Sequence, residues 1–533
     1  MSTAAQRKAI GGRLIRWDDT RAADAYARGL WVRTTLADAL REAARTDPDR
    51  VLLVDGDVEV TSAGLLRCAQ SLAATMRARM PAGSVVSFML PNWHEAAVVY
   101  LAATVARMVV NPVLPSLRDH ELRFILEDAD VRMIFIPNVF RGHDYGAMLT
   151  RVAAQLPDPP EVVVVRGAAG SHTAYGELLD ADAAIDPVGD IDPDTVHMIM
   201  YTSGTTGRPK GVLHSHNSLH ALISQIRSNW LVTPGDAFLV ASPIAHIGGS
   251  IYAFECPLLA GATAVLMERW DADDAIAVMT ARHCTHMAGA TPFLEQLLSA
   301  ATRAQTRLPD LKVFICGGAS VPPSLIRSAT AFFDKATVTR VYGSTEVPVT
   351  TVGSPGEPGP AAETDGRAGI ADIRLDADGQ ICARGAQMLV GYLHAEDEDG
   401  SFDAEGFFLT GDLGRWDDGH LVVTGRAKDL IIRNGENISP KEVEDVLITH
   451  PAIAEVAVVG LPDSRTGERA CAVVVPDGDT NPTVDDLDVF LVSHGMARFK
   501  VPERVEIWEA LPRNDAGKVL KHRIRTVLAE GAK

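Results

Sequence analysis

The chain is best approached from its segment at residues 201–212, Tyr-Thr-Ser-Gly-Thr-Thr-Gly-Arg-Pro-Lys-Gly-Val, which follows the apolar, β-rich run Val196–Met200. Four small hydroxyl side chains and two glycines come before a pair of cations and a third glycine. Glycine lets the backbone approach a ligand closely, so N–H groups and hydroxyls can surround phosphate oxygens. Arg208 and Lys210 would offset the phosphate charge. The segment therefore predicts a strand that leads into a phosphate-binding loop.

The segment differs from the P-loop pattern G-x-x-x-x-G-K-[ST]. Gly204 and Gly207 lie too close together, and Gly211 follows Lys210 where that pattern needs Ser or Thr. Composition alone would also fit an ordinary Ser/Thr/Gly surface loop. The rest of the chain has to decide between these interpretations.

Length and charge narrow the class of protein. A chain of 533 residues, 47% hydrophobic and 22% charged, suits a globular enzyme of about three folding units. A net charge of −19 disfavours nucleic acid as a partner and gives no general attraction to anionic lipid. Any anionic substrate must therefore be held by local cations.

Cysteine spacing and hydropathy indicate a cytoplasmic protein without a membrane span. The six cysteines show no C-x-x-C spacing, as expected of buried thiols in a reducing compartment. The N-terminus lacks the apolar core of a signal peptide. The most apolar stretch, residues 96–114, is interrupted by Arg107, Asn111 and Pro112, and therefore predicts a buried helix followed by a strand.

The order of helical and strand patterns along the chain predicts an α/β N-terminal domain and a smaller α+β C-terminal domain. Helical and strand patterns alternate from residue 35 until the pattern changes near residue 370, which is typical of a parallel sheet with crossover helices. Short alternating strands with Asp-Gly turns then predict a small antiparallel barrel or sheet. We expect an N-terminal domain at 1–425 with a barrel-like subdomain at 369–425, a hinge at 426–428 and a mobile C-terminal lid at 429–533.

Four further motifs follow the first in a fixed order. They are Gly317-Gly318-Ala319-Ser320, Tyr342-Gly343-Ser344-Thr345-Glu346, Thr410-Gly411-Asp412 and a loop from Leu511 that ends in Lys518. Each one alone would also fit a turn, a core residue or a solvated charge. Together, and over nearly the whole chain, they resemble the adenylate-forming superfamily of acyl-CoA synthetases, peptide-synthetase adenylation domains and luciferases.

This resemblance implies that ATP and Mg²⁺ are bound. It places Tyr342 on the adenine, Thr345 at the α-phosphate, Asp412 and Arg426 at the ribose, and Mg²⁺ on Glu346 and Thr206. A carboxylate is a hard oxygen ligand of the kind that magnesium prefers. The residues expected to hold the nucleotide are Thr202, Ser203, Gly204, Thr205, Thr206, Gly207, Lys210, Gly317, Gly318, Ala319, Tyr342, Gly343, Ser344, Thr345, Asp412 and Arg426.

The resemblance also implies a lid that serves two half-reactions. Lys518 would enter the site and bridge the carboxylate to the phosphate and ribose oxygens, although Asn514 stands where the family usually has threonine. The lid would then turn about Lys428 and bring Gly435, Glu436 and Asn437 to the adenylate for coenzyme A. Gly435 would leave room for a pantetheine arm, whereas a turn or bulge glycine is the structural alternative. The expected catalytic residues are Lys518, His246, Thr206 and Glu346.

The residues that bind the acid are harder to predict from the sequence. The segment at residues 241–252 resembles the family's gate and acyl pocket, with His246 at the gate, and the region as a whole is most similar to medium-chain and cyclohexanecarboxylate CoA ligases. Aryl-acid ligases for 2-hydroxybenzoates commonly carry asparagine where this chain has Ile247. The expected lining residues are His246, Ile247, Gly248, Gly249, Ala319 and Val347.

We therefore expect an acid:CoA ligase that forms an acyl-AMP and then an acyl-CoA. The acid would be medium-chain, alicyclic or aromatic. A related enzyme that passes the acyl group to a carrier protein or an amine shares the first half-reaction. A catalytically silent nucleotide-binding protein is the alternative from another class. The oligomeric state is open, with a homodimer as one option.

Overall fold

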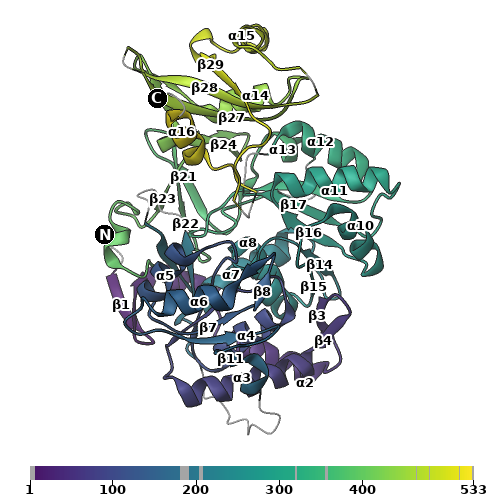
Figure 1. Ribbon diagram of the computed structural model, residues 1–533, viewed down its shortest axis with the longest axis vertical. Helices are drawn as coiled ribbons and strands as arrows, with labels where there is room; N and C mark the ends of the chain where they lie inside the picture. The colour runs from purple at the N-terminus through teal and green to yellow at the C-terminus, as the bar shows by residue number, and fades with distance from the viewer. Residues whose placement is uncertain are drawn as a thin grey trace.

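The computed structural model describes residues 6–179, 191–202, 208–318, 321–353, 358–463, 465–478, 480–514 and 517–530. A large body contains the purple to green part of the chain, and the yellow C-terminal part forms a small body stacked on one end of it (Figure 1). Among these residues no helix combines the length and apolar character needed to cross a bilayer. All six cysteines are free thiols, five of them buried.

The first sheet of the large body has seven strands. Neighbouring strands pair in parallel except for the last two, which are antiparallel. Parallel neighbours require crossover connections, and helices supply them. In spatial order the strands are Thr173–Ala174 (β11), Glu161–Val164 (β10), Val131–Ile136 (β7), Val85–Phe88 (β5), Val109–Pro112 (β6), Val196–Thr202 (β12) and Lys210–Ser215 (β13). The helices include Ser62–Arg79 (α3), His94–Val105 (α4), Asp119–Asp128 (α5), Tyr145–Ala153 (α6) and His216–Asn229 (α7).

The second sheet also has seven strands and joins distant parts of the sequence. Its two N-terminal strands form a hairpin that extends an otherwise parallel sheet built from residues 237–341. In spatial order the strands are Thr337–Val341 (β18), Val313–Gly317 (β17), His286–Gly289 (β16), Ala237–Val240 (β14), Thr263–Leu266 (β15), Val51–Asp55 (β3) and Val58–Thr61 (β4). The associated helices include Leu36–Thr46 (α2), Ala272–Ala281 (α10), Thr291–Arg303 (α11) and Pro323–Phe332 (α12).

The core lies between the two sheets and continues behind the second. Along β17, Val313 and Ile315 join the core shared with the first sheet, while Phe314 and Cys316 join a cluster on the other face. Both faces of this sheet are therefore buried, which explains why its strands read as continuous apolar runs. Helix α4 is central, because it contacts β5 and β6 of the first sheet and β3 of the second.

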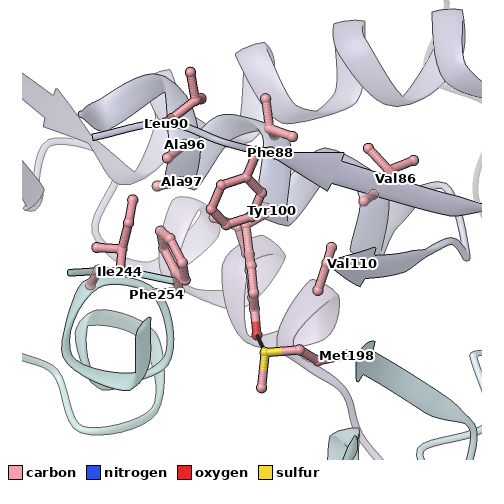
Figure 2. Close-up of a cluster of buried hydrophobic side chains, with 14 of the residues drawn as sticks. Val86, Phe88, Leu90, Ala96, Ala97, Tyr100, Val110, Met198, Ile244 and Phe254 are labelled. Atoms are coloured by element: carbon pink, nitrogen blue, oxygen red, sulfur yellow. Dashed lines mark hydrogen bonds between the residues drawn. The ribbon is translucent and has the colours of Figure 1, made fainter. Parts of the chain in front are cut away.

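A polar network is enclosed in this apolar core. Tyr100 of α4 stacks on Phe254 with ring centroids 4.3 Å apart, and Figure 2 shows the ring among Phe88, Val110 and Met198. Its hydroxyl donates to Glu255, at the end of the π-helical turn Ile251–Glu255 (η2), and lies 2.9 Å from Nε2 of His197. Burial is the main cause that raises the pKa of Glu255 from its ordinary value of 4.5 to about 8.

Antiparallel strands occupy the expected barrel-like region, but they form an open sheet. The pairing order is Asp372–Leu375 (β21), Gln380–Arg384 (β22), Phe408–Asp417 (β23) and His420–Arg426 (β24). Of the barrel or sheet that the sequence left open for 369–425, the described residues form the sheet. Four strands are too few to enclose a filled interior, which takes about eight.

The C-terminal body is a five-stranded sheet with helices on both faces. One face packs on Pro440–Leu447 (α14) and Val484–Ser493 (α15), and the other on Lys521–Glu530 (α16). Helix α15 is followed by Gly495 at φ +82°, a left-handed conformation that glycine adopts without strain and that ends the helix. The strands are Ile431–Arg433 (β25), Glu436–Ile438 (β26), Ile453–Asp463 (β27), Gly467–Pro476 (β28) and Arg504–Ile507 (β29).

The remaining elements are short and lie mostly in the large body. They are Gln6–Ile10 (β1), Arg13–Trp17 (β2), Asp19–Ala27 (α1), Val139–Phe140 (β8), His143–Asp144 (β9), Tyr175–Leu178 (η1), Ile247–Ser250 (α8), Cys256–Leu259 (α9), Thr351–Val352 (β19), Pro358–Glu363 (α13), Arg367–Ala368 (β20), Ala395–Glu398 (η3), Ala427–Asp429 (η4) and Arg498–Lys500 (η5). The expected hinge at 426–428 coincides with the end of β24 and the start of η4.

We predict that Glu255 makes the folded state less stable as pH rises. Its carboxyl stays protonated to a higher pH in the folded chain than in the unfolded chain. The free energy of unfolding therefore falls as pH rises from 4.5 to about 8, by about 1.4 kcal/mol per pH unit. The Glu255→Gln variant replaces the titrating carboxyl by a neutral amide, whose oxygen can still accept the hydrogen bond from Tyr100. In urea unfolding it should gain stability relative to wild type between pH 5.5 and pH 8.

The exposed Glu127→Gln change is the matched control and should give a difference from wild type that does not vary with pH. A Glu255→Gln difference that is equally flat would contradict a buried, protonated Glu255.

Candidate active site

The predicted motifs converge where strands of the second sheet end. His246 follows β14, Gly317 and Gly318 close β17, and Tyr342 follows β18. Ligands of open parallel sheets bind at the carboxyl ends of the strands. Strand β12 of the first sheet delivers Thr202 at its own carboxyl end, where the predicted phosphate loop begins.

A buried carboxylate links two of the motifs. Asp412 is 7% exposed and accepts a hydrogen bond of 2.8 Å from the Tyr342 hydroxyl at Oδ2. Its Oδ1 lies 3.0 Å from Nε of Arg426, the last residue of β24. Three residues predicted at the adenine and ribose thus form one charge-assisted cluster, which fixes the orientation of Asp412.

Asp412 lies within β23, yet its side chain leaves the regular strand pattern to contact Tyr342 and Arg426. The reason is a bulge: the register of β22 against β23 shifts between Gln380 and Cys382, and Gly411 takes φ +71°. The amide of Gly411 donates to the side chain of Gln380. A bulge re-aims the neighbouring side chain without ending the strand.

The predicted catalytic lysine lies near this cluster. The pKa of Lys518 is lowered from 10.5 to about 8, mainly by burial and also by Arg426 and Lys428, while Asp412 and Asp429 act in the opposite direction. The loop docks on the large body, because a Cβ on Gly517 would meet Ala290 and Pro292 at 3.5 Å. The C-terminal body therefore places Lys518 close enough to Asp412 for the two charges to interact.

Two other predicted ligands contact residues that the sequence analysis did not select. The ammonium of Lys210 donates to the backbone oxygen of Asp397 at 2.9 Å. Glu346 accepts a bond of 3.1 Å at Oε1 from the hydroxyl of Tyr392. Tyr392 and Asp397 were missed because they lie in a segment with no helical or strand periodicity. The Gly391-Tyr392 pair after an apolar run is the signal that could have drawn attention there.

Two glycines are required by close backbone approach. A Cβ on Gly343 would lie 2.6 Å from the amide of Val349, and one on Gly317 would collide with Val341. The neighbouring Ser344 accepts a bond of 3.2 Å from the amide of Val347, and the backbone oxygen of Thr345 accepts one of 2.7 Å from His214. These contacts form the turn after β18 around the predicted nucleotide residues.

The predicted acid pocket divides into open and packed positions. His246 caps α8; Gly248 is exposed and has open space where a Cβ would point, while a Cβ on Gly249 would strike the backbone oxygen of Pro243. Ile247 is partly buried against the main core. Val347, however, is fully buried in a cluster with Val212, Met388 and Tyr392, so its side chain belongs to packed core.

The residues predicted for the second half-reaction lie on the C-terminal body or at its boundary with the large body. Asn434 and Gly435 form the turn between β25 and β26 at φ +51° and +84°, and no atom lies within 4 Å of a Cβ built on Gly435. Glu436, Asn437 and Lys428 are exposed. The predicted residues Ser203, Gly204, Thr205, Thr206, Gly207 and Ala319 lie outside the described part of the chain.

Comparison with known families identifies this arrangement. The family model for the AMP-binding enzyme matches residues 40–393, more than half of the chain, and the model for the AMP-binding enzyme C-terminal domain matches residues 442–518. The chain belongs to the AMP-binding enzyme family. The first model matches within the large body and the second within the C-terminal body, and Lys518 is the last residue matched.

Similar proteins support the family assignment over nearly the full length of the chain. The chain is 32% identical to a medium-chain fatty-acid–CoA ligase of Escherichia coli, over 96% of this chain and 93% of that protein. It is 30% identical to a 2,3-dihydroxybenzoate-AMP ligase of Bacillus subtilis, over 96% and 97%. The ATP-bound structure of MatB from Rhodopseudomonas palustris superposes with a TM-score of 0.82 at 27% identity, covering 93% of this chain and 100% of that one. The chain is thus an ATP-dependent, AMP-forming acid–thiol ligase.

We predict that adenylation depends on the charge of Lys518. Because the pKa of Lys518 is about 8, the ammonium form is lost above that pH, and kcat/KM for ATP should fall on the alkaline side. The Lys518→Ala variant should lose acid-dependent pyrophosphate release at every pH. It should still form thioester from a supplied acyl adenylate. Wild-type pyrophosphate release by Lys518→Ala would contradict the assignment.

Proposed function

We propose that this ligase joins a medium-chain, alicyclic or aromatic carboxylic acid to coenzyme A through an acyl-AMP. The observation that carries the assignment of residues is the position of Lys518, which lies close enough to Asp412 and Arg426 for their charges to alter its pKa. A lysine near the C-terminus is normally solvated. Here it lies in a partly buried site, next to the carboxylate predicted to hold ribose.

The first half-reaction needs a cation between two anions. The acid carboxylate attacks the α-phosphorus of ATP, and their repulsion at low effective dielectric amounts to several kcal/mol. Lys518 would bridge the two groups, while Asp412 accepts the ribose hydroxyls and Tyr342 covers the adenine. Docking of the Gly517 loop on Pro292 would exclude water, which matters because the mixed anhydride hydrolyses.

The residues of the site fit magnesium as the ion that accompanies ATP. Glu346 uses Oε1 for Tyr392, and Oε2 has no hydrogen bond to any residue in the described ranges. One or two carboxylates, with several waters retained, are what Mg²⁺ usually takes from a protein. The bound ion would neutralise phosphate charge. Thr206, the second ligand that we propose, lies outside the described residues.

The second half-reaction would follow a rotation of the lid about Lys428, at the start of η4. Lys428 is exposed and lies two residues after Arg426, which pairs with Asp412. The turn at Gly435 would then face the adenylate and admit the pantetheine arm of coenzyme A. Its open surroundings in the present arrangement fit a segment that is used only after rotation.

The acid is proposed from the pocket and from relatives. Ile247 stands where ligases of 2-hydroxybenzoates commonly have asparagine, and exposed Gly248 leaves space beside His246. An apolar pocket of this kind distinguishes acids weakly, at about 1–3 kcal/mol per methylene. The similarity to a medium-chain fatty-acid–CoA ligase supports the same class. The free cysteines support a cytoplasmic location, which is also a proposal.

The main test is an acid panel. Medium-chain, cyclohexane, benzoic and 2-hydroxybenzoic acids are each supplied with ATP and Mg²⁺, with and without coenzyme A. We expect pyrophosphate release with the first three classes, weak release with 2-hydroxybenzoic acids, and an acyl-CoA mass only when coenzyme A is present. Release without any acyl-CoA would favour a carrier protein or an amine as acceptor, an alternative kept open by the similarity to a 2,3-dihydroxybenzoate-AMP ligase. No acid-dependent release would overturn the proposed function.

The Gly435→Leu change should block the second half-reaction only. The new side chain would fill the proposed pantetheine path, and positive φ at this position adds strain for any non-glycine residue. Acyl-AMP formation measured by pyrophosphate exchange should remain near wild type while acyl-CoA formation falls. Gly435→Ala is the smaller control and separates the effect of strain from that of bulk. Equal loss of both half-reactions would contradict a path at this turn.

A further inference from the structure

The segment from Val390 to Leu393 is fixed against the strand that begins with Lys210. The amide of Leu393 donates to Gly211 at 2.8 Å, and the amide of Leu213 donates to Gly391 at 3.0 Å. This irregular pairing continues the first sheet beyond β13. It sets Tyr392 in a single register, opposite Val212 and beside the Lys210 side chain.

Tyr392 lies between two predicted ligands of opposite charge. The ammonium of Lys210 is 5.0 Å from the centroid of its ring, a cation–π distance. Its hydroxyl donates to Oε1 of Glu346 at 3.1 Å. The side chain is 2% exposed, so little water competes for either contact. One tyrosine therefore contacts both the cation proposed for phosphate and the carboxylate proposed for Mg²⁺.

The neighbouring turn η3 holds the cations from the other side. The backbone oxygen of Asp397 accepts from Lys210, and its carboxylate accepts a bond of 2.9 Å from Arg208. The turn is itself anchored, because Glu398 pairs with Arg7 of β1 at 2.6 Å. The two cations that end the predicted phosphate loop are thus tied to a fixed element of the large body.

We propose that Tyr392 is a positioning residue for the nucleotide, with separate tasks for its hydroxyl and its ring. The hydroxyl holds one oxygen of Glu346 so that the other is available to Mg²⁺. The ring, together with the Asp397 carbonyl, holds the Lys210 ammonium toward phosphate. This inference rests on the proposed function, since that function gives Glu346 and Lys210 their roles.

The two tasks can be separated by substitution. Tyr392→Phe keeps the ring over Lys210 and removes only the hydroxyl that contacts Glu346. Tyr392→Leu removes both contacts while keeping an apolar side chain in the cluster with Val347 and Phe408. A residue needed only for packing would instead lower stability and all activities together.

The experiment measures ATP binding by calorimetry, without acid, over a series of Mg²⁺ concentrations. For Tyr392→Phe, the Mg²⁺ concentration that gives half of the full ATP affinity should rise about 10-fold, the effect typical of losing a group that orients a metal ligand. Its ATP affinity at saturating Mg²⁺ should stay within about twofold of wild type, since the ring remains over the ammonium. Tyr392→Leu should also weaken ATP binding at saturating Mg²⁺, by about threefold or more.

Tyr26→Phe is the matched control, because the Tyr26 hydroxyl also donates to a carboxylate, Asp194, at 2.9 Å but lies outside the site. It should change neither quantity. An unchanged Mg²⁺ midpoint in Tyr392→Phe would overturn the proposal. So would a parallel loss of both quantities with a lowered melting temperature of the ligand-free protein. Wild-type protein that binds ATP with Mg²⁺ but releases no pyrophosphate with any acid would refute the proposed function alone.

Discussion

The approach of one ammonium group to one buried carboxylate organises the whole site. Asp412 accepts a hydrogen bond from the Tyr342 hydroxyl and pairs with the Arg426 side chain. It also interacts electrostatically with Lys518. Burial and two neighbouring cations make this position unfavourable for a charged lysine, as its lowered pKa indicates. An anionic nucleotide would reverse that balance. The lid closure proposed above would therefore be coupled to nucleotide binding through the same electrostatic interaction.

Arg426 connects the Asp412 cluster to the start of the C-terminal body. It ends β24, it binds Asp412, and the next residues form the turn from which the C-terminal body begins. The proposed rotation about Lys428 would thus start beside this ion pair. It would leave Asp412, the proposed ribose ligand, in place while the C-terminal body changes the face that it presents.

Local patterns made much of the fold and several site residues predictable. The strands that start at Val85 and Val313, and the stop at Gly495, follow from apolar runs and glycine chemistry over a few residues. Motif order predicts that Tyr342, Asp412 and Lys518 share one site, and the structure places the three residues near one another. Val347 shows the limit, because a position next to a motif does not reveal whether a side chain lines a pocket or fills a core.

What the sequence could not supply are contacts across long separations. Lys210 meets Asp397 through a pairing of irregular backbone that has no period to detect. The open sheet at β21–β24 depends on which edges meet, and alternation within a strand does not specify this. Tyr100 and Glu255 sit in segments that look uniformly apolar, yet tertiary packing makes them a polar pair.

The parallel pairing of β3 with β15 means that the second sheet can be completed only late in folding. Leu53 pairs with Ala264, yet the entire first sheet lies between them in the sequence. During synthesis the β3–β4 hairpin emerges early and keeps an apolar edge unpaired until β15 has left the ribosome. Such late, non-local closure is slow and leaves nascent chains prone to aggregation. For the same reason the large body has no internal cut that yields two self-sufficient halves, although its two sheets look like separate modules.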